Sequence, residues 1–453
     1  MRSINPTNGE VVAEYDEHAP AEVARRIDAA HSAYEEWRRV PFADRAVAMH
    51  RAGELLEKRK DELARLMTLE MGKPLAAGRA EAEKCAWACR HYADNGEQML
   101  ADVPIATERT RSYIHHEPIG VVLAVMPWNF PFWQVFRFLA PALMAGNAGV
   151  LKHASNVSGS ALAIEEIVLD AGFPEGLFSS LLIGSDRVEE VLEHPRVVAA
   201  TLTGSDPAGR AVAAKAGSLL KKTVLELGGS DPYLVLADAS VAAAAKTCAA
   251  SRMINNGQSC IAAKRFIVVP EVAAAFTSAF VSEMASYEMG DPLDETTRLG
   301  PLARLDLRDD LHGQVTRSVA AGAELLLGGK IPEGGGAFYP PTVLGGVKKG
   351  MPAYEEEMFG PVATVIEAKD EDEAIAVAND SPFGLGAAVF SSDVARAERI
   401  AATRLEAGCC FVNALVASDP RLPFGGIKTS GYGRELSELG IKEFVNQKTV
   451  VVA

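Results

Sequence analysis

The chain has little positive charge for its length. Its 453 residues include 45 Lys and Arg against 60 Asp and Glu, giving a formal net charge of -15. This balance excludes the broad basic surface of a nucleic-acid-binding protein, although it allows a local basic pocket for an anionic substrate. The length exceeds one ordinary hydrophobic core, so two or three domains are expected.

Cysteines are few and show no disulfide framework, which favours a protein of the reducing cytoplasm. The six cysteines are Cys85, Cys89, Cys248, Cys260, Cys409 and Cys410. Cys85 and Cys89 share one face of an expected helix, and core packing is favoured over a metal pair because no further Cys or His follows with metal-ligand spacing. The sequence lacks the HExxH pattern, and His115-His116 is expected on an exposed strand. We therefore expect no metal.

Export and membrane signals are also missing. Residues 1–6 contain neither a basic nor an apolar stretch of the kind that begins a signal peptide. The apolar run at 119–125 is too short to cross a bilayer and is ended by Pro127. Both absences favour a cytoplasmic location. No internal repeat or low-complexity linker divides the chain.

The pattern of apolar residues predicts an α/β fold. Extended segments are expected around the turn at 5–9, and three helices should follow, of which the first starts near Pro20. Strands and helices then alternate twice along the chain, which predicts parallel, doubly wound sheets. The expected strands are 119–126, 148–152, 177–183, 198–203, 233–236 and 265–269, and the expected helices are 55–67, 75–99, 161–171, 188–194 and 242–254, with the second series running on to Phe411.

Three short strings carry groups that acyl transfer needs. They are PWNFP at 127–131, LELGGSDP at 225–232 and NNGQSC at 255–260. Asn129 offers an amide donor for an oxyanion, Glu226 a base and Cys260 a nucleophile. None of the three residues is convincing evidence alone. A lone cysteine, for example, is more often an inert core residue than a catalyst. A surface role for Glu226 is disfavoured by its apolar and glycine neighbours.

Read in order, a longer set of strings resembles the aldehyde dehydrogenase superfamily. The set is PWNFP, LKHAS, LTGS, LELGGSDP, GQSC, EEMFGP and PFGGIKTSGYGRE, and it covers nearly the whole chain. LKHASN and LELGGSDP are similar to the bacterial succinate-semialdehyde dehydrogenase branch. The resemblance implies two doubly wound parallel-sheet domains and a small β arm for oligomerisation. Residues 1–102 and 119–229 would form the dinucleotide-binding domain, 230–438 the catalytic domain, and 103–118 with 439–453 the arm.

In that family the arm pairs with a neighbouring subunit, so a homodimer or homotetramer is implied. The strand-like stretch 444–452 should join the arm. Two ordinary edge strands are the alternative, and pattern alone does not decide between them.

The resemblance also assigns the chemistry. The Cys260 thiolate would attack an aldehyde, and the resulting thiohemiacetal would lose a hydride to leave a thioester. The Asn129 side chain and the Cys260 backbone N–H would stabilise the oxyanion. Glu226 would act as base for hydrolysis. The presence of Glu226 disfavours the family branches that release the acyl group to coenzyme A.

The expected cofactor is NADP, with NAD as the open alternative. The usual GxGxxG string is absent, and TGSDPAG at 203–209 stands between an expected strand and helix. Members that prefer NAD carry a glutamate where this chain has Ser155, and a serine does not repel a 2′-phosphate. The alternative is that Ser155 tolerates both cofactors. The family positions that imply cofactor binding are Trp128, Lys152, His153, Ala154, Ser155, Gly204, Ser205, Leu227 and Glu357.

Three residues are expected at the substrate tail. Arg137 and Ser418 match residues that bind the distal carboxylate in succinate-semialdehyde dehydrogenases. A second arginine of some relatives is replaced by Ile254, and either Arg421 compensates or the pocket is less selective. The predicted activity is NADP-preferring oxidation of succinate semialdehyde to succinate. A broader NAD(P)-dependent aldehyde dehydrogenase and a cysteine hydrolase without a redox role are the alternatives. A binding protein without catalysis is disfavoured, because Asn129, Glu226 and Cys260 are all retained.

Overall fold

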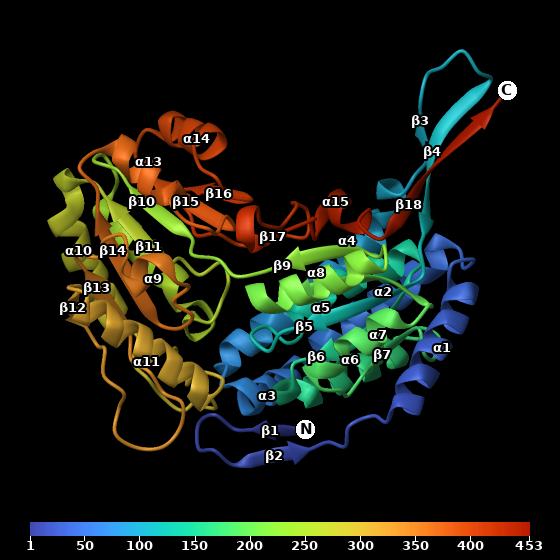
Figure 1. Ribbon diagram of the computed structural model, residues 1–453, viewed down its shortest axis with the longest axis horizontal. Coiled ribbons are helices and arrows are strands. Elements are labelled where there is room, and N and C mark those ends of the chain that lie inside the picture. The colour runs from blue at the N-terminus through green and yellow to red at the C-terminus, as the bar shows by residue number, and fades with distance from the viewer.

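The computed structural model describes residues 1–453 as two α/β lobes and a projecting arm (Figure 1). Each lobe has its own sheet and its own cluster of buried apolar side chains. The α/β class predicted from the sequence is confirmed. No helix is both long and apolar enough to span a bilayer.

The N-terminal part is a small hairpin followed by four helices. Strands β1 (Arg2–Ile4) and β2 (Val11–Glu14) pair antiparallel, and the helices are α1 (Pro20–Trp37), α2 (Phe42–Lys58), α3 (Lys60–Met71) and α4 (Leu75–Met99). The sequence predicted three helices, which is wrong. The backbone leaves the helical range at Arg59 (φ -95°, ψ 6°) and separates α2 from α3. Apolar residues continue on both sides of this break, so their pattern does not reveal it.

The first sheet has six strands and is parallel except at one edge. Its order is β17 (Gly431–Tyr432), β9 (Lys222–Glu226), β8 (Val197–Thr203), β5 (Val121–Met126), β6 (Ala148–His153) and β7 (Phe178–Ser180), with only β17 antiparallel. Residues of β5 are almost all buried, as expected for a parallel strand covered on both faces. The accompanying helices are α5 (Trp133–Ala145), α6 (Ser158–Asp170), α7 (Val188–Glu193) and α8 (Asp206–Ser218), with short 3-10 turns at Ser155–Val157 and Ser185–Arg187.

The strand order reverses at β5. From β5 the chain adds β6 and β7 on one side, and β8 and β9 then follow on the other side. In open parallel sheets, ligands bind outside the carboxyl ends of the strands at such a reversal. A site is therefore expected where β5 and β8 end.

The second sheet has seven strands and is parallel except at β12. Its order is β12 (Glu324–Leu327), β13 (Thr342–Gly345), β14 (Val362–Glu367), β11 (Arg265–Val268), β10 (Pro232–Val235), β15 (Gly386–Phe390) and β16 (Cys409–Val412). Its helices are α9 (Val241–Met253), α10 (Pro270–Ala285), α11 (Leu305–Ala320), α12 (Pro352–Glu355), α13 (Glu371–Asn379) and α14 (Val394–Thr403), with a 3-10 turn at Ile254–Gly257. The strand β17, which follows this lobe in sequence, returns to the edge of the first sheet.

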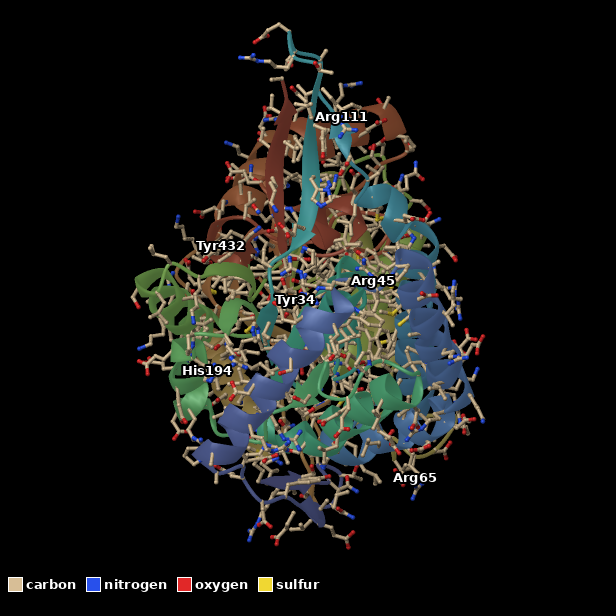
Figure 2. The ribbon with its side chains drawn as sticks, turned by 90° about the vertical axis from the view of Figure 1, so that its right-hand side faces the viewer. Tyr34, Arg45, Arg65, Arg111, His194 and Tyr432 are labelled. Carbon is tan, nitrogen blue, oxygen red and sulfur yellow. The ribbon has the colours of Figure 1, made fainter.

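The arm is a three-stranded antiparallel sheet. It consists of β18 (Val445–Val452), β4 (Arg111–Pro118) and β3 (Val103–Pro104), and the turn Lys428–Ser430 and helix α15 (Ser437–Ile441) precede β18. The arm extends away from both lobes, with Arg111 on it (Figure 2). The prediction that the C-terminal stretch joins the arm is confirmed, because Val445 pairs with Pro118 and Val452 with Arg111.

The two histidines of β4 are not equivalent. His115 is exposed and lies 2.7 Å from Asp102, whereas His116 is buried. Expecting both on an exposed strand was wrong for His116, since neighbouring strand residues point to opposite faces. Cys85 and Cys89 are fully buried in the core of the first lobe, as predicted.

Candidate active site

A cleft of about 290 Å³ lies at the strand-order reversal of the first sheet. Pro127 and Trp128 follow the end of β5, Gly204 and Ser205 follow β8, and residues 227–228 follow β9. The opposite side of the cleft comes from the second lobe. The lining residues are Pro127, Trp128, Asn129, Thr203, Gly204, Ser205, Leu227, Gly228, Cys260, Leu307, Glu357 and Phe359. Cys260 and Asn129, far apart in the sequence, thus meet in one cleft with several residues expected to bind a cofactor.

The loop that carries Cys260 has an unusual backbone. Asn255, Asn256 and Gly257 are consecutive residues with positive φ, at 54°, 57° and 75°. Such φ values are uncommon for residues other than glycine and are found at functional sites. A Cβ at Gly257 would lie 2.2 Å from the Gly360 backbone, so only glycine can occupy this position.

Side-chain amides hold this loop against both lobes. Asn255 Nδ2 donates to the Asn129 carbonyl at 2.7 Å. Asn256 Nδ2 donates to the carbonyls of Gly72 and Pro301, both at 3.0 Å. These hydrogen bonds fix the nucleophile loop relative to the backbone of the oxyanion candidate.

Lys264 lies beneath the loop and was not identified from the sequence. Its side chain is fully buried, and Nζ donates to the carbonyls of Ser259 at 2.9 Å and Cys260 at 2.6 Å. Nζ also lies 3.2 Å from Glu357 Oε1, which accepts from Gly229 N–H at 3.1 Å. Lys264 therefore connects the nucleophile loop to the carboxylate expected at the nicotinamide ribose. Its position four residues after Cys260, at the start of a buried strand, was the available signal.

Cys260 is in its thiol form at neutral pH. Burial raises the pKa of Cys260 to about 12, while the charges of Arg137 and Lys264 act in the opposite direction. Nucleophilic attack therefore requires a proton acceptor. The Asn129 amide donates one hydrogen bond, to the Gln258 carbonyl at 3.2 Å. Its second N–H is free to donate to an oxyanion.

Glu226 ends β9 and is 2% exposed. Burial, with the Glu435 charge, raises the pKa of its carboxyl to about 8, and the charges of Arg137 and Arg434 oppose the shift. Its carboxylate makes no hydrogen bond within the chain. It packs over Gly425, where a Cβ would lie 2.7 Å from Oε1. Glu226 does not line the cleft in this conformation, so it must turn toward Cys260 to act there.

Arg137 already has an anionic partner. It is 2% exposed on α5, and its Nε lies 2.5 Å from Glu435 Oε2. Nη2 donates to Thr203 Oγ1 at 3.4 Å. Arg137 lines a small neighbouring cavity with Glu435 and Arg434, and not the Cys260 cleft. Glu435 lies within the string PFGGIKTSGYGRE, but nothing in that string indicates which side chain it meets.

The other two residues expected at the substrate tail differ in accessibility. Ser418 is buried, and its Oγ accepts a hydrogen bond from Lys84 Nζ at 2.8 Å. Arg421 is exposed and bidentate on Asp419, at 2.9 and 2.7 Å. The charge of Arg421 is therefore balanced locally at the surface. Lys84 was not identified from the sequence, where it follows Glu83 in a helix of mixed charged and apolar residues.

The four expected cofactor residues at the end of β6 differ in environment. Ser155 is exposed at the start of a 3-10 turn, with Ala154 before it, and Lys152 is buried. The His153 ring is committed to the backbone, with Nε2 2.9 Å from the Pro131 carbonyl and Nδ1 accepting from Ala154 N–H at 3.0 Å. Burial lowers the pKa of His153 to about 4, so the ring is neutral.

Comparisons with known proteins agree with this geometry. A model of the aldehyde dehydrogenase family matches residues 1–450. The succinate-semialdehyde dehydrogenase (NADP(+)) of Mycolicibacterium paratuberculosis is 52% identical over 454 residues, covering 99% of this chain and 96% of the relative. A probable succinate-semialdehyde dehydrogenase (NADP(+)) of Synechocystis is 50% identical over the full length of both chains.

A solved structure is also similar throughout. The succinic semialdehyde dehydrogenase of Streptococcus pyogenes, in complex with NADP+ as the cofactor, is 39% identical, with a TM-score of 0.97. The match covers 100% of this chain and 99% of that one. The two-lobed fold, the cleft and the full-length family match lead to one conclusion: the chain belongs to the aldehyde dehydrogenase family.

Proposed function

We propose that this chain oxidises succinate semialdehyde to succinate and prefers NADP to NAD. The observation that carries the proposal is the meeting of Cys260 and Asn129 with Gly204, Ser205 and Glu357 in one cleft. Support for the substrate and cofactor comes from relatives named succinate-semialdehyde dehydrogenase (NADP(+)) at 50% and 52% identity.

The residues at the cleft are suited to hold a dinucleotide. Gly204 and Ser205 line the cleft at the N-terminus of α8, the end at which a helix attracts phosphate. Gly209 allows α8 to approach Leu227, because a Cβ there would lie 2.6 Å from the Leu227 side chain. Ser155 places no carboxylate near the adenosine ribose, which favours the 2′-phosphate of NADP. When bound, the cofactor accepts the hydride that leaves the substrate carbon.

The reaction proceeds through sulfur chemistry at Cys260. The thiol gives its proton to solvent water, and the sulfur bonds to the aldehyde carbon while the carbonyl oxygen becomes an oxyanion held by Asn129 and the Cys260 N–H. Loss of hydride from this thiohemiacetal leaves a thioester. Water then attacks the acyl carbon, Glu226 takes the proton, and the C–S bond breaks to release succinate and restore the thiol. Aldehyde, NADP+ and water are consumed, and acid, NADPH and a proton are formed.

A matrix of aldehydes and cofactors tests the proposal. We expect kcat/KM to be highest for succinate semialdehyde with NADP among C2 to C5 aldehydes and semialdehydes assayed with NAD and NADP. Equal values across uncharged aldehydes would instead identify a broad-specificity aldehyde dehydrogenase. Ester cleavage without NADPH formation from any aldehyde would identify a cysteine hydrolase.

We also propose a cytoplasmic homodimer or homotetramer that assembles through the arm. The arm exposes Val103, Ile105, Val451 and Val452, between 38% and 53% accessible. Exposed apolar side chains on an open sheet edge favour pairing with another chain. Light scattering should give the mass of a dimer or tetramer, and Val451→Asp should reduce it. A monomeric wild-type protein would contradict this assembly.

A further inference from the structure

We propose that Lys84 of α4 supplies the positive charge that binds the distal carboxylate of the substrate, together with the Ser418 hydroxyl. This inference rests on the proposed function, because it names the residue that recognises the charged end of a semialdehyde. Neither the family motifs nor the sequence pattern assigns a role to Lys84.

The position of Lys84 is fixed by contacts between α4 and α5. Glu81 Oε1 accepts hydrogen bonds from the backbone N–H groups of Phe132 and Trp133, both at 2.9 Å. The first turn of α5, four residues after Asn129, is thereby attached to α4. Lys84 lies one helical turn beyond Glu81, and its Nζ lies 4.6 Å from the centre of the Trp133 ring. Helices α4, α5 and α15 run close together in this region (Figure 1).

Lys84 is a half-buried cation without an anionic partner. Its Nζ donates to Ser418 Oγ at 2.8 Å and forms no ion pair. Burial and the Arg137 charge together lower the pKa of Lys84 to about 8. The charges of Glu81 and Asp419 oppose this shift, but those two carboxylates form ion pairs with Lys73 and Arg421. A buried charge normally has a partner of opposite sign. The two arginines expected at the tail already have such partners, Glu435 for Arg137 and Asp419 for Arg421.

The missing partner of Lys84 is therefore a ligand carboxylate. Contacts connect this region to the Cys260 loop: Trp133, whose ring Lys84 contacts, follows Asn129 by four residues, and the Asn129 amide donates to the Gln258 carbonyl at 3.2 Å. Trp133 and Arg137 are four residues apart and occupy one face of α5. A short chain with an aldehyde at Cys260 and a carboxylate at Lys84 matches a semialdehyde of a dicarboxylic acid. Lys84 thus supplies the positive charge that a second arginine supplies in some relatives, at the position of Ile254 in this chain.

Two substitutions separate the charge of Lys84 from its other contacts. Lys84→Met keeps the length of the side chain beside Trp133, and Lys84→Gln also keeps a donor for Ser418. Lys246→Met is the matched control, since Lys246 is exposed, makes no ion pair and carries the same charge. For each protein, kcat and KM are measured with succinate semialdehyde, glutarate semialdehyde and butanal, using NADP.

We expect both Lys84 variants to lower kcat/KM for succinate semialdehyde about 10- to 30-fold through KM, with butanal changed less than about twofold. Lys246→Met should match the wild type. The proposal would be overturned if kcat/KM fell equally for butanal and succinate semialdehyde, or did not fall at all. It would also be overturned if Lys84→Gln kept the wild-type ratio of kcat/KM between these two substrates. If the wild type prefers glutarate semialdehyde and the Lys84 variants lose kcat/KM for it by the same factor, the proposed substrate would be wrong. The proposed role of Lys84 in binding the distal carboxylate would then be supported. A wild type with no preference for either semialdehyde over butanal would overturn both.

Discussion

The ionisation of Glu226 should control how fast the thioester is hydrolysed. Glu226 accepts the proton of the attacking water only as a carboxylate, and its pKa is raised to about 8 by burial and by Glu435. Cys260 has a pKa raised to about 12, so its own titration lies above the usual assay range. Of the two groups in the chemical step, Glu226 is therefore the one expected to titrate between pH 7 and pH 9, whereas Lys84, whose pKa is also about 8, should affect substrate binding and hence KM.

The size of the effect follows from that pKa. Roughly a tenth of Glu226 is ionised at pH 7, half at pH 8 and nine-tenths at pH 9. Where hydrolysis limits turnover, kcat should rise about fivefold from pH 7 to pH 8 and less than about twofold from pH 8 to pH 9.

Substitution of Glu226 should separate the two halves of the reaction. In Glu226→Gln, stopped-flow absorbance should record a burst of roughly one NADPH per active site and then a slow, nearly pH-independent steady state. Glu435→Gln is the matched control, because it removes the neighbouring charge that raises the pKa of Glu226 and should move the rise of kcat to lower pH. A first turnover as slow as the later ones in Glu226→Gln would show that Glu226 acts mainly on the thiol. An unchanged pH profile in Glu435→Gln would show that the two carboxylates are not coupled.

Unfolding provides an independent measurement of the same ionisation. The folded pKa of Glu226, about 8, lies above the ordinary value of 4.5 for a glutamate in water. The stability contributed by the bound proton is thus fully present below pH 4.5 and is lost as the pH rises through 8. The wild type should lose unfolding free energy between pH 5 and pH 9, on the order of a few kcal/mol, and Glu226→Gln should lose less. Parallel curves in denaturant titrations would contradict the raised pKa.

Three further substitutions test other parts of the site. Cys260→Ala should abolish aldehyde oxidation and thiol labelling at the site. NADP binding, measured by fluorescence, should stay nearly intact. More than about a hundredth of wild-type activity would exclude Cys260 as the nucleophile. Ser155→Glu should shift the NADP/NAD ratio of kcat/KM toward NAD, and an unchanged ratio would mean that Ser155 does not face the ribose. Arg137→Ala removes a charge that lowers the pKa of Glu226, so the rise of kcat should move above pH 8 with every aldehyde. A loss confined to succinate semialdehyde would instead support the tail-binding role predicted from the sequence.

Much of the fold could be predicted because it depends on local patterns. Continuous apolar runs identified the buried parallel strands, and their alternation with helices gave the sheet type. The break at Arg59 was missed, since a change of one residue's backbone leaves the apolar pattern intact. The strand at residues 177–183 was predicted too long, and β7 covers only Phe178–Ser180.

The site was predictable where a short string carried its function, and less so where the function comes from contact between distant segments. Cys260 and Asn129 could be predicted to share a site because each belongs to a distinctive string, and the structure places both in one cleft. The pairing of Arg137 with Glu435 joins residues far apart in the chain, and only the folded structure brings them together. Lys84 stands among alternating charged and apolar residues, and nothing there distinguishes it from a surface lysine. Lys264 had one signal, its position at the start of a buried strand four residues after Cys260, but that signal does not indicate which groups the side chain contacts.

The charges around Cys260 divide into two groups with separate tasks. Arg137 is paired with Glu435 and lowers the pKa of Glu226, so its charge acts on the base. Lys84 has no carboxylate partner and lies beside Ser418, so its charge is available to a ligand. A substrate carboxylate placed at Arg137 would add a third anionic group next to Glu226 and Glu435, and like charges at close range would raise the pKa of Glu226 further. The same carboxylate at Lys84 would balance a cation that forms no ion pair, and Lys84 is not among the charges that shift the pKa of Glu226. Binding of the tail at Lys84 therefore leaves Glu226 able to lose its proton near pH 8, which hydrolysis of the thioester requires.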